Sequence, residues 1–275
     1  MEEDFLREEQ VAKDALERYS GSKAEDFLSY VLLTNFPQYV EYFARSRKLK
    51  VTQGSMFTAA HSHEENVSIL DFKIGSPSAA LVIDLCAHLP IKACLLLGMC
   101  GGLRRRYKKG DYLIPIAAIR GEGTSDFYFP IEVPALSNFL TQRAVSEILD
   151  KEKAIYHIGI THTTNKRFWE FDENFKDRLK ANRSQAIEME CATLFAASYR
   201  KKLPLGALLL VSDLPLDRKG IKTKKSADEI FSNHTSDHVE KGVRILHRLC
   251  DLQKQKSRGA YRPDVSKGDA TSDSF

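Results

Sequence analysis

The sequence has no long apolar run, and this excludes the simplest kind of membrane protein. Its strongest apolar runs, Ala93–Leu97 and Leu205–Val211, have the length of strands and are far too short to cross a bilayer. The opening segment, MEEDFLREEQ, is acidic and lacks the basic-then-apolar order of a secretion signal. We therefore expect a soluble, cytoplasmic protein that has no membrane partner.

The sequence also lacks the cysteine and histidine spacings of metal sites and disulfide frameworks. No CxxC pair is present, and buried free thiols in a reducing compartment are the expected state of the cysteines. His61 and His63 lie two residues apart beside glutamates, but no third ligand stands at a zinc-like spacing. We expect no metal and no cofactor. The five cysteines are Cys86, Cys94, Cys100, Cys191 and Cys250.

The chain also lacks a large excess of charge of either sign. The formal net charge is +4 over 275 residues, and basic and acidic residues are interspersed. The only dense basic cluster is RRRYKK, at Arg104–Lys109, and no aromatic platform accompanies it. We interpret this cluster as a solvated loop between strands and expect no nucleic-acid partner.

The chain contains no internal repeat and no internal linker rich in proline, glycine or serine. With 43% apolar residues it can bury a substantial core. We expect residues 1–252 to form a single domain that begins with a helix. Residues 253–275 lose apolar periodicity and are rich in Lys, Ser, Gly and Asp, which predicts a disordered tail.

Strand-like runs alternate with helical patterns, and this alternation predicts an α/β fold with a mixed, largely buried central sheet. The expected strands are Tyr30–Leu33, Val67–Phe72, Ala93–Leu97, Tyr112–Ile119, Ala154–Thr161 and Leu205–Val211. The expected helices are Asp4–Gly21, Pro77–His88, Val133–Lys153, Ala186–Lys201 and Ala227–Leu252.

Two candidate ligand-binding segments follow strands with small residues. In KIGSPSAA, Ser76 is a plausible helix N-cap, so backbone amides there could hold an anion, although an ordinary turn explains the segment equally well. In LLLGMCGGL, Gly98, Gly101 and Gly102 allow either a close approach to a ligand or a tight turn. Cys100 lacks a nearby base in sequence, which favours a buried thiol over a nucleophile.

Two further segments contain carboxylates at strand or helix ends. In AIEMECATLFAA, Glu188 or Glu190 could favour a helix start electrostatically or accept hydrogen bonds from ribose hydroxyls. In ALLLVSDLP, Asp213 follows a wholly apolar strand. It could form an Asx turn, or desolvation could raise its pKa so that it donates a proton near neutrality.

In this order the segments resemble the nucleoside phosphorylase superfamily, which includes purine nucleoside phosphorylases and nucleosidases. The resemblance extends over about Tyr30–Leu249 and is greatest to the short-form AMP nucleosidases within that superfamily. It implies a nucleoside phosphorylase-like, three-layer α/β/α fold around a mixed sheet, and a homo-oligomer, hexameric or built from dimers. The segments are LLTNFPQYVEYFA, SILDFKIGSPSAALVIDL, LLLGMCGGL, IPIAAIRGEGTSDFYFP, HTTNKRFWE, AIEMECATLFAA and GALLLVSDLPL.

The resemblance also implies roles for individual residues. Glu190 corresponds to the carboxylate that grips the ribose 2′ and 3′ hydroxyls, with Met189 against the sugar face. Asp213 corresponds to the residue that protonates the purine at N7. These roles suit a reaction in which the ribose becomes cation-like while electrons move into the base. The implied reaction is hydrolysis of AMP to adenine and ribose 5-phosphate in purine salvage.

Two departures from the superfamily bear on the nucleophile. Where the phosphorylases have an arginine and a serine that hold phosphate, this chain has Leu96 and Met99, which favours water as the nucleophile. Where related nucleosidases have a water-activating glutamate, the chain reads TNFPQY. Asn35 could orient water there, and Glu122 and Glu41 are further candidates for its activation.

The remaining parts of a nucleotide substrate also need partners. Arg120 and Arg167 lie in segments that match active-site loops and suit a 5′-phosphate, although both could instead be surface or ion-paired arginines. Phe168 or Trp169 could stack on the base, with core packing as the alternative for Trp169. Cleavage of an unphosphorylated purine nucleoside by water or phosphate, and binding of a nucleotide without catalysis, remain alternative functions.

Overall fold

The central strands bury apolar side chains on both faces, so helices must cover both faces of the sheet. In β1 (Tyr30–Thr34), Val31 and Leu33 belong to one core cluster, whereas Tyr30 and Leu32 belong to the other. The same alternation recurs in β10 (Leu205–Asp213), where Leu209 and Leu210 belong to opposite clusters. Burial on both faces explains why these strands are almost entirely apolar.

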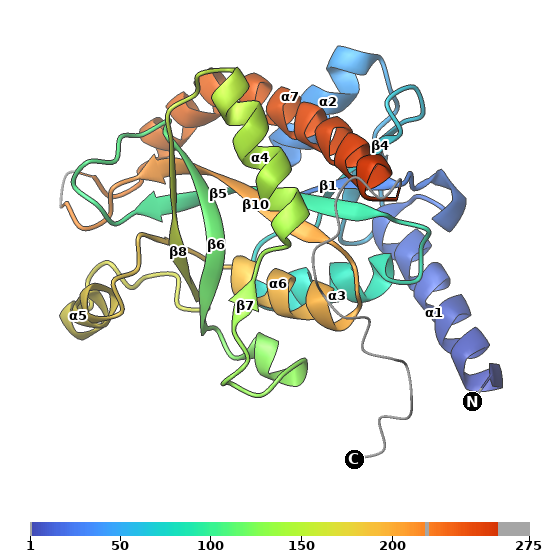
Figure 1. Ribbon diagram of the computed structural model, residues 1–275, viewed down its shortest axis with the longest axis horizontal. Helices are drawn as coiled ribbons and strands as arrows, with labels where there is room; N and C mark the ends of the chain where they lie inside the picture. The colour runs from blue at the N-terminus through green and yellow to red at the C-terminus, as the bar shows by residue number, and fades with distance from the viewer. Residues whose placement is uncertain (1, 218–219, 258–275) are drawn as a thin grey trace.

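The computed structural model describes residues 2–217 and 220–257. The first core cluster includes side chains from α1, α3 and α6, and the second includes side chains from α2, α4 and α7, so two helical layers enclose the sheet (Figure 1). The expected α/β fold with a mixed central sheet is confirmed. The helix bounds are α1 (Glu2–Ser20), α2 (Pro37–Arg47), α3 (Ser76–Cys86), α4 (Phe139–Lys151), α5 (Glu173–Ala181), α6 (Cys191–Arg200) and α7 (Lys224–Ser257).

The sheet runs in the order β10-β6-β8-β9-β5-β1-β4-β3-β2, with β7 beside β6. Strands β4, β1, β5 and β10 are mutually parallel along this sheet, whereas β10 and β6 are antiparallel. The remaining bounds are β2 (Thr52–Gln53), β3 (Thr58–Ser62), β4 (Val67–Asp71), β5 (Ala93–Gly102), β6 (Tyr112–Gly121), β7 (Ala135–Leu136), β8 (Tyr156–Thr164) and β9 (Ala186–Glu188).

Strand β5 closes part of this sheet on itself. It pairs with β1 on one side and with β10 over Cys94–Gly101 on the other, and its last residues pair with β9. Strands β10, β6, β8 and β9 then complete a closed circuit back to β5. The closure brings the ends of β5, β8, β9 and β10 together.

Several elements differ from the sequence-based expectation. The helix expected from Val133 begins only at Phe139, because residues 135–136 pair with β6 and Asn138 caps the helix by accepting a hydrogen bond from Thr141 N. Residues 186–188 form β9 instead of the first turn of a helix. Helix α7 continues past Leu252 to Ser257, and residues 258–275 of the expected tail lie outside the described residues.

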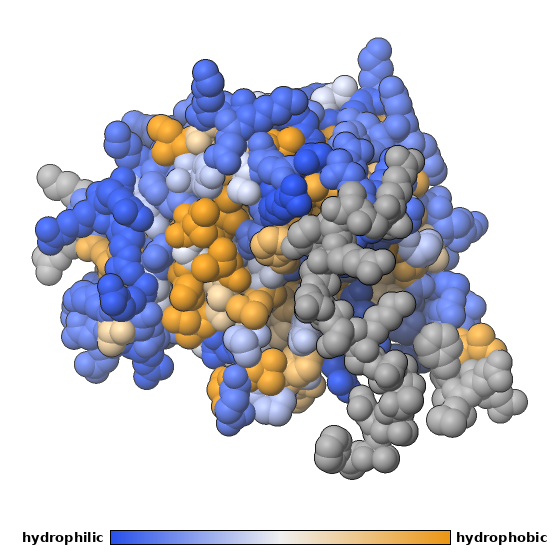
Figure 2. Space-filling model, in the orientation of Figure 1, coloured by the Kyte–Doolittle hydropathy of each residue, from blue (hydrophilic) through white to orange (hydrophobic). Residues whose placement is uncertain are grey.

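An apolar patch lies on the outer face of the closed part of the sheet. Ile116, Leu136, Ile158 and Ile160 are 47%, 54%, 51% and 39% exposed, respectively. In Figure 2 a hydrophobic band covers the position of β6 and β8. Among the helices of the described residues, none combines the length and apolarity that a membrane span requires.

Candidate active site

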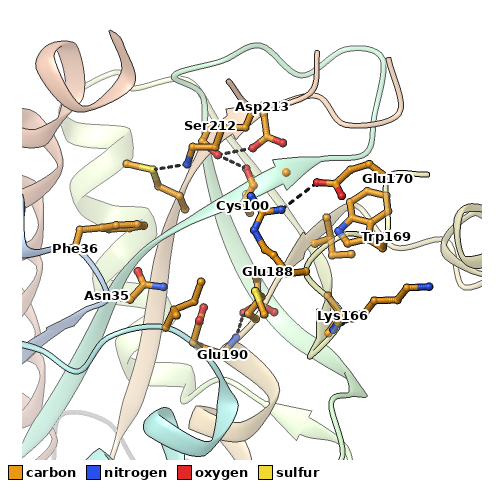
Figure 3. A pocket seen from close by; sticks show the side chains of 18 residues that line it. Asn35, Phe36, Cys100, Lys166, Trp169, Glu170, Glu188, Glu190, Ser212 and Asp213 are labelled. Carbon is orange, nitrogen blue, oxygen red and sulfur yellow. Dashed lines mark hydrogen bonds and ion pairs between the residues drawn. The ribbon is translucent and has the colours of Figure 1, made fainter. Parts of the chain in front are cut away.

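A cavity lies where β5, β8, β9 and β10 end, and side chains from the residues that follow β1 and β4 complete its wall (Figure 3). It contains most of the residues that the motifs indicated. Those residues are Asn35, Gly101, Arg167, Trp169, Glu188, Met189, Glu190 and Asp213. The wall also includes residues that sequence reasoning did not select as site residues, among them Phe36, Ile74, Lys166, Glu170, Ser212 and Lys222.

The other expected site residues lie outside the cavity wall. Gly98 packs in β5, where a Cβ would approach Leu209 Cδ2 to 2.9 Å. Ser76 Oγ donates a hydrogen bond of 2.7 Å to the carbonyl oxygen of Met189, so it supports a lining residue. Phe168 is 76% exposed, whereas its neighbour Trp169 is 4% exposed.

Arg120 stabilises the loop that follows β6. Its five N–H groups donate to Ser125 Oγ, Asp126 Oδ1 and the carbonyl oxygens of residues 129, 130 and 133. A guanidinium has five N–H donors, and all of them are used here. This arrangement leaves Arg120 no donor for the 5′-phosphate that we expected it to hold.

Glu190 reaches the cavity between β9 and α6. Its Oε1 accepts a hydrogen bond of 2.8 Å from the backbone N–H of Gly75, whose φ of 101° favours glycine. Burial, assisted by the charge of Glu188, raises the pKa of Glu190 to about 8, against hydrogen bonds that include one from Asn35. The site therefore holds this carboxyl in a desolvated environment with few donors.

Glu188 lies two residues away and has a different environment. Its Oε1 accepts a 2.5 Å hydrogen bond from Thr163 Oγ1, and its Oε2 accepts from the backbone N–H groups of Glu190 and Cys191 at 2.7 and 2.6 Å. Burial raises the pKa of Glu188, and these hydrogen bonds oppose the rise. Glu188 thus fixes the turn that presents Met189 and Glu190 to the cavity.

Asp213 occupies the opposite end of the cavity from Glu190 (Figure 3). It is 9% exposed, and Ser212 Oγ donates a 2.6 Å hydrogen bond to its Oδ1. Burial raises its pKa, while the hydrogen bond from Ser212 and the positive charges of Lys222 and Arg167 lower it. Glu170 raises it further. Burial thus lets the protonated form of this carboxyl persist to a higher pH than in an exposed aspartate.

The segment that follows β8 contributes Arg167, Trp169 and Glu170 to the wall. Glu170 is 7% exposed, and its Oε1 accepts a 3.1 Å hydrogen bond from Arg167 Nη1. Its Oε2 is buried and has no hydrogen-bond partner. Trp169 packs in a small core with Leu179 and Ile187, as the core-packing alternative expected, and it also lines the cavity.

The two positions that differ from the phosphorylases have separate surroundings. Leu96 is 1% exposed and belongs to the core, away from the cavity wall. Met99 lines the cavity, and its sulfur lies 3.7 Å from Lys222 Nζ. Burial lowers the pKa of Lys222, which the Asp213 charge opposes. Lys222 therefore brings a partly desolvated cation to the cavity.

The candidates for orienting water do not all line the cavity. Asn35 lines the cavity, and its Oδ1 is buried without a hydrogen-bond partner. Glu122 is buried elsewhere and accepts a hydrogen bond from the N–H of Ser125, and Glu41 is exposed on α2. Of the three, only Asn35 faces the site.

His61 forms hydrogen bonds through both ring nitrogens, to Ser68 Oγ and Ser22 Oγ, each at 2.9 Å. Burial lowers its pKa to about 4. In the part of the chain that the structure describes, no three His, Cys, Asp or Glu side chains are placed to hold a metal ion.

Cys100 is buried and its thiol pKa is raised well above the usual range by burial.

The model of the phosphorylase superfamily matches residues 22–250, a range that includes every strand of the described residues and every residue that lines the cavity. The chain belongs to the phosphorylase superfamily. The crystal structure of an AMP nucleosidase from Bacteroides thetaiotaomicron, also similar in fold, is 35% identical, with a TM-score of 0.79, and the match covers 91% of this chain and 99% of that one. The resemblance inferred from the motifs is therefore confirmed.

Other similar proteins include both a nucleosidase and phosphorylases. An AMP nucleosidase of Escherichia coli is 29% identical over 85% of this chain, which spans only 57% of that relative's length. A guanosine phosphorylase of Halorubrum lacusprofundi is 32% identical over 74% of this chain and 81% of its own length. A uridine phosphorylase of Vibrio fischeri, at 15% identity and a TM-score of 0.72, shares the fold. Membership of the superfamily alone leaves the substrate open.

Proposed function

We propose that the chain hydrolyses the N-glycosidic bond of AMP, releasing adenine and ribose 5-phosphate. The observation that supports this most is the pair of buried carboxyls at opposite ends of one cavity, Asp213 and Glu190 (Figure 3). Asp213 would protonate the base, and Glu190 would bind the ribose hydroxyls. Similarity to two proteins named AMP nucleosidases agrees with this substrate.

The reaction needs a proton at the base and negative charge at the sugar. As the C1′–N9 bond breaks, its electrons move into the purine, and Asp213 donates its proton to N7. The ribose becomes cation-like. The 2′ and 3′ hydroxyls donate hydrogen bonds to Glu190, which lowers its pKa from about 8, and the resulting carboxylate stabilises the charge on the ribose. Met189 packs against the sugar. The oxygen of water then bonds to C1′, and the proton that it loses passes through solvent and restores the acid form of Asp213.

Asn35 is our candidate for orienting that water. Its unpartnered Oδ1 is buried in the cavity wall, and its side chain bonds to Glu190 on the ribose side. An unpartnered buried carbonyl oxygen accepts a hydrogen bond from any donor that reaches it. Water held there would lie on the sugar side of the cavity, away from the base.

Cations on the cavity wall suit the 5′-phosphate. We assign this role to Arg167 and Lys222, both of which line the cavity. Arg167 donates one N–H to Glu170, and its guanidinium has further N–H groups that can donate to a phosphate. Trp169 would stack on the base, because it is buried and borders the cavity.

Product analysis tests this function directly. The purified chain is incubated with AMP, adenosine, IMP and methylthioadenosine, with and without phosphate, and free base and sugar are separated by chromatography. Adenine and ribose 5-phosphate from AMP, formed without phosphate, are expected. Dependence on phosphate would make the chain a phosphorylase. Protection of the chain against heat by AMP with no base released would indicate a nucleotide-binding protein instead.

We also propose that the chain forms a homo-oligomer through the patch of Ile116, Leu136, Ile158 and Ile160. Exposed apolar groups of this kind mark protein interfaces. Ile158→Lys places a charge in the patch, and it is expected to shift the mass in sedimentation from an oligomer toward a monomer. Lys180→Glu, at an exposed position on α5, is the control and should leave the mass unchanged. An unchanged mass for Ile158→Lys would exclude this patch.

A further inference from the structure

Glu170 has an acceptor oxygen that the protein does not use. One carboxylate oxygen accepts from Arg167 Nη1 at 3.1 Å, and the other, Oε2, is buried without a partner. Leaving such an acceptor unpaired costs free energy, more for a charged group than for a neutral one. The arrangement therefore favours a ligand that brings a hydrogen-bond donor to Oε2.

Glu170 lies at the same end of the cavity as Asp213. The close-up shows the two side chains near each other, with Asn35 and Glu190 at the other end (Figure 3). The charge of Glu170 also raises the pKa of Asp213. If Asp213 protonates N7, then Glu170 faces the same part of the purine.

The chemistry of the purine edge decides what Glu170 can bind. In adenine, N7 and the 6-amino group lie side by side on one edge, as an acceptor and a donor. In hypoxanthine and guanine, the neighbour of N7 is a carbonyl oxygen, which is an acceptor. A carboxylate beside Asp213 accepts from the 6-amino group and repels the 6-oxo group.

We propose that Glu170 selects 6-aminopurines, with Oε2 accepting a hydrogen bond from the 6-amino group while Asp213 serves N7. Arg167 holds the other oxygen and so fixes the direction of the carboxylate. This inference rests on the proposed function, because it assumes that a purine occupies the Asp213 end of the cavity.

Activation of water is the other role open to a buried carboxylate, and its position argues against it. The nucleophile must approach C1′ from the face opposite the departing base. Glu170 lies beside Asp213, on the side of the base, and Asn35 and Glu190 lie at the sugar end. Glu170 is therefore assigned to recognition of the base.

The test compares three ribotides that differ in the group at position 6 of the purine: AMP, IMP and purine ribonucleoside 5′-monophosphate. The last has hydrogen at position 6, and the 6-oxo form of IMP also has a proton at N1. In Glu170→Ala, kcat/KM for AMP should fall about 10- to 100-fold, as for loss of a hydrogen bond to a charged group, while kcat/KM for the 6-unsubstituted ribotide should stay within about threefold. Glu170→Gln can turn its amide toward a 6-oxo group, so the ratio of IMP to AMP cleavage should rise. Glu173→Gln, exposed on α5, is the matched control. It should change neither kcat/KM for AMP and the 6-unsubstituted ribotide nor the ratio of IMP to AMP cleavage.

Equal losses on all three ribotides would overturn the proposal, because they would show that Glu170 only supports the site through Arg167. Preference of the wild-type chain for IMP over AMP would overturn it as well. If the wild-type chain binds these ribotides but cleaves none, the proposed function fails separately. The same ratios, measured as dissociation constants by calorimetry, then decide the role of Glu170.

Discussion

Asp213→Asn should lower kcat for AMP hydrolysis by about 10²- to 10⁴-fold and leave the affinity for AMP near the wild-type value. The asparagine amide retains a hydrogen-bond donor for N7 but has no proton to give. Ser212 can still donate to the side-chain oxygen, so the local geometry is preserved. Steady-state kinetics and calorimetric binding of AMP separate the two effects.

The pH dependence and a modified substrate make this prediction specific. Because burial raises the pKa of Asp213, the proton-donating form persists above the usual range of an aspartate, and wild-type activity falls as the pH rises through that raised pKa. The variant should lack this falling limb. A purine ribotide methylated at N7 already has the positive charge, so the variant should cleave it nearly as well as the wild-type chain does.

Asp177→Asn is the matched control, since Asp177 is 71% exposed and pairs with Lys180 on α5. Its kinetics should equal those of the wild-type chain. A loss in Asp213→Asn that appears in AMP affinity instead of kcat would contradict the role of proton donor. So would an equal loss on the N7-methylated ribotide.

The motifs at strand ends could be predicted because their signals are local. An apolar run that stops at VSDLP or GMCGGL indicates both the strand and its polar end. Asp213 and Gly101 accordingly line the cavity, as does Glu190 in EMEC. The resemblance to a superfamily added the order of these segments, which composition does not contain.

Residues 186–188 were assigned to a helix for a physical reason that tertiary structure overrides. Alanine, glutamate, methionine and leucine are strong helix formers, so AIEMECATLFAA appears helical throughout. Pairing of Ile187 with both Gly101 and His162 instead draws the segment into the sheet as β9. That pairing joins residues far apart in sequence, and local propensity contains no information about it.

Glu170 and Lys222 escaped prediction because both lie in polar loops. Glu170 occurs in NKRFWEFDENF, where charged residues are common and none has a distinctive spacing. Its place in the cavity wall depends on its burial and on the closure of β5 with β10, β6, β8 and β9. Arg120 shows the converse, since a basic residue in a matching segment proved to hold its own loop.

Glu190→Gln should make the chain more stable and less active. The folded chain retains the proton of Glu190 up to about pH 8, because burial and Glu188 raise its pKa, whereas an unfolded chain releases it near the ordinary value of 4.5. Between these values the folded chain binds more protons, so the carboxyl lowers stability progressively as the pH rises through this window. Glutamine has no proton to release and avoids this loss.

The expected gain in the free energy of unfolding is on the order of 2 to 4 kcal/mol above about pH 8 and is small near pH 4.5. Urea unfolding at both ends of the window measures it. Gly75 N–H can still donate to the amide oxygen of glutamine, so the turn at α3 keeps its contact. Glu173→Gln, which replaces a 75% exposed carboxylate, should show no such pH-dependent gain.

Whereas the stability of Glu190→Gln should rise, its kcat should fall by about 10²- to 10³-fold. The reason is that a neutral amide stabilises a cation-like ribose much less than a carboxylate does. Stability gained where activity is lost is the pattern of a group held in an unfavourable environment for its chemistry. A variant that is both less active and less stable would show that Glu190 is needed for the fold. A variant of unchanged kcat would exclude the carboxylate from the reaction.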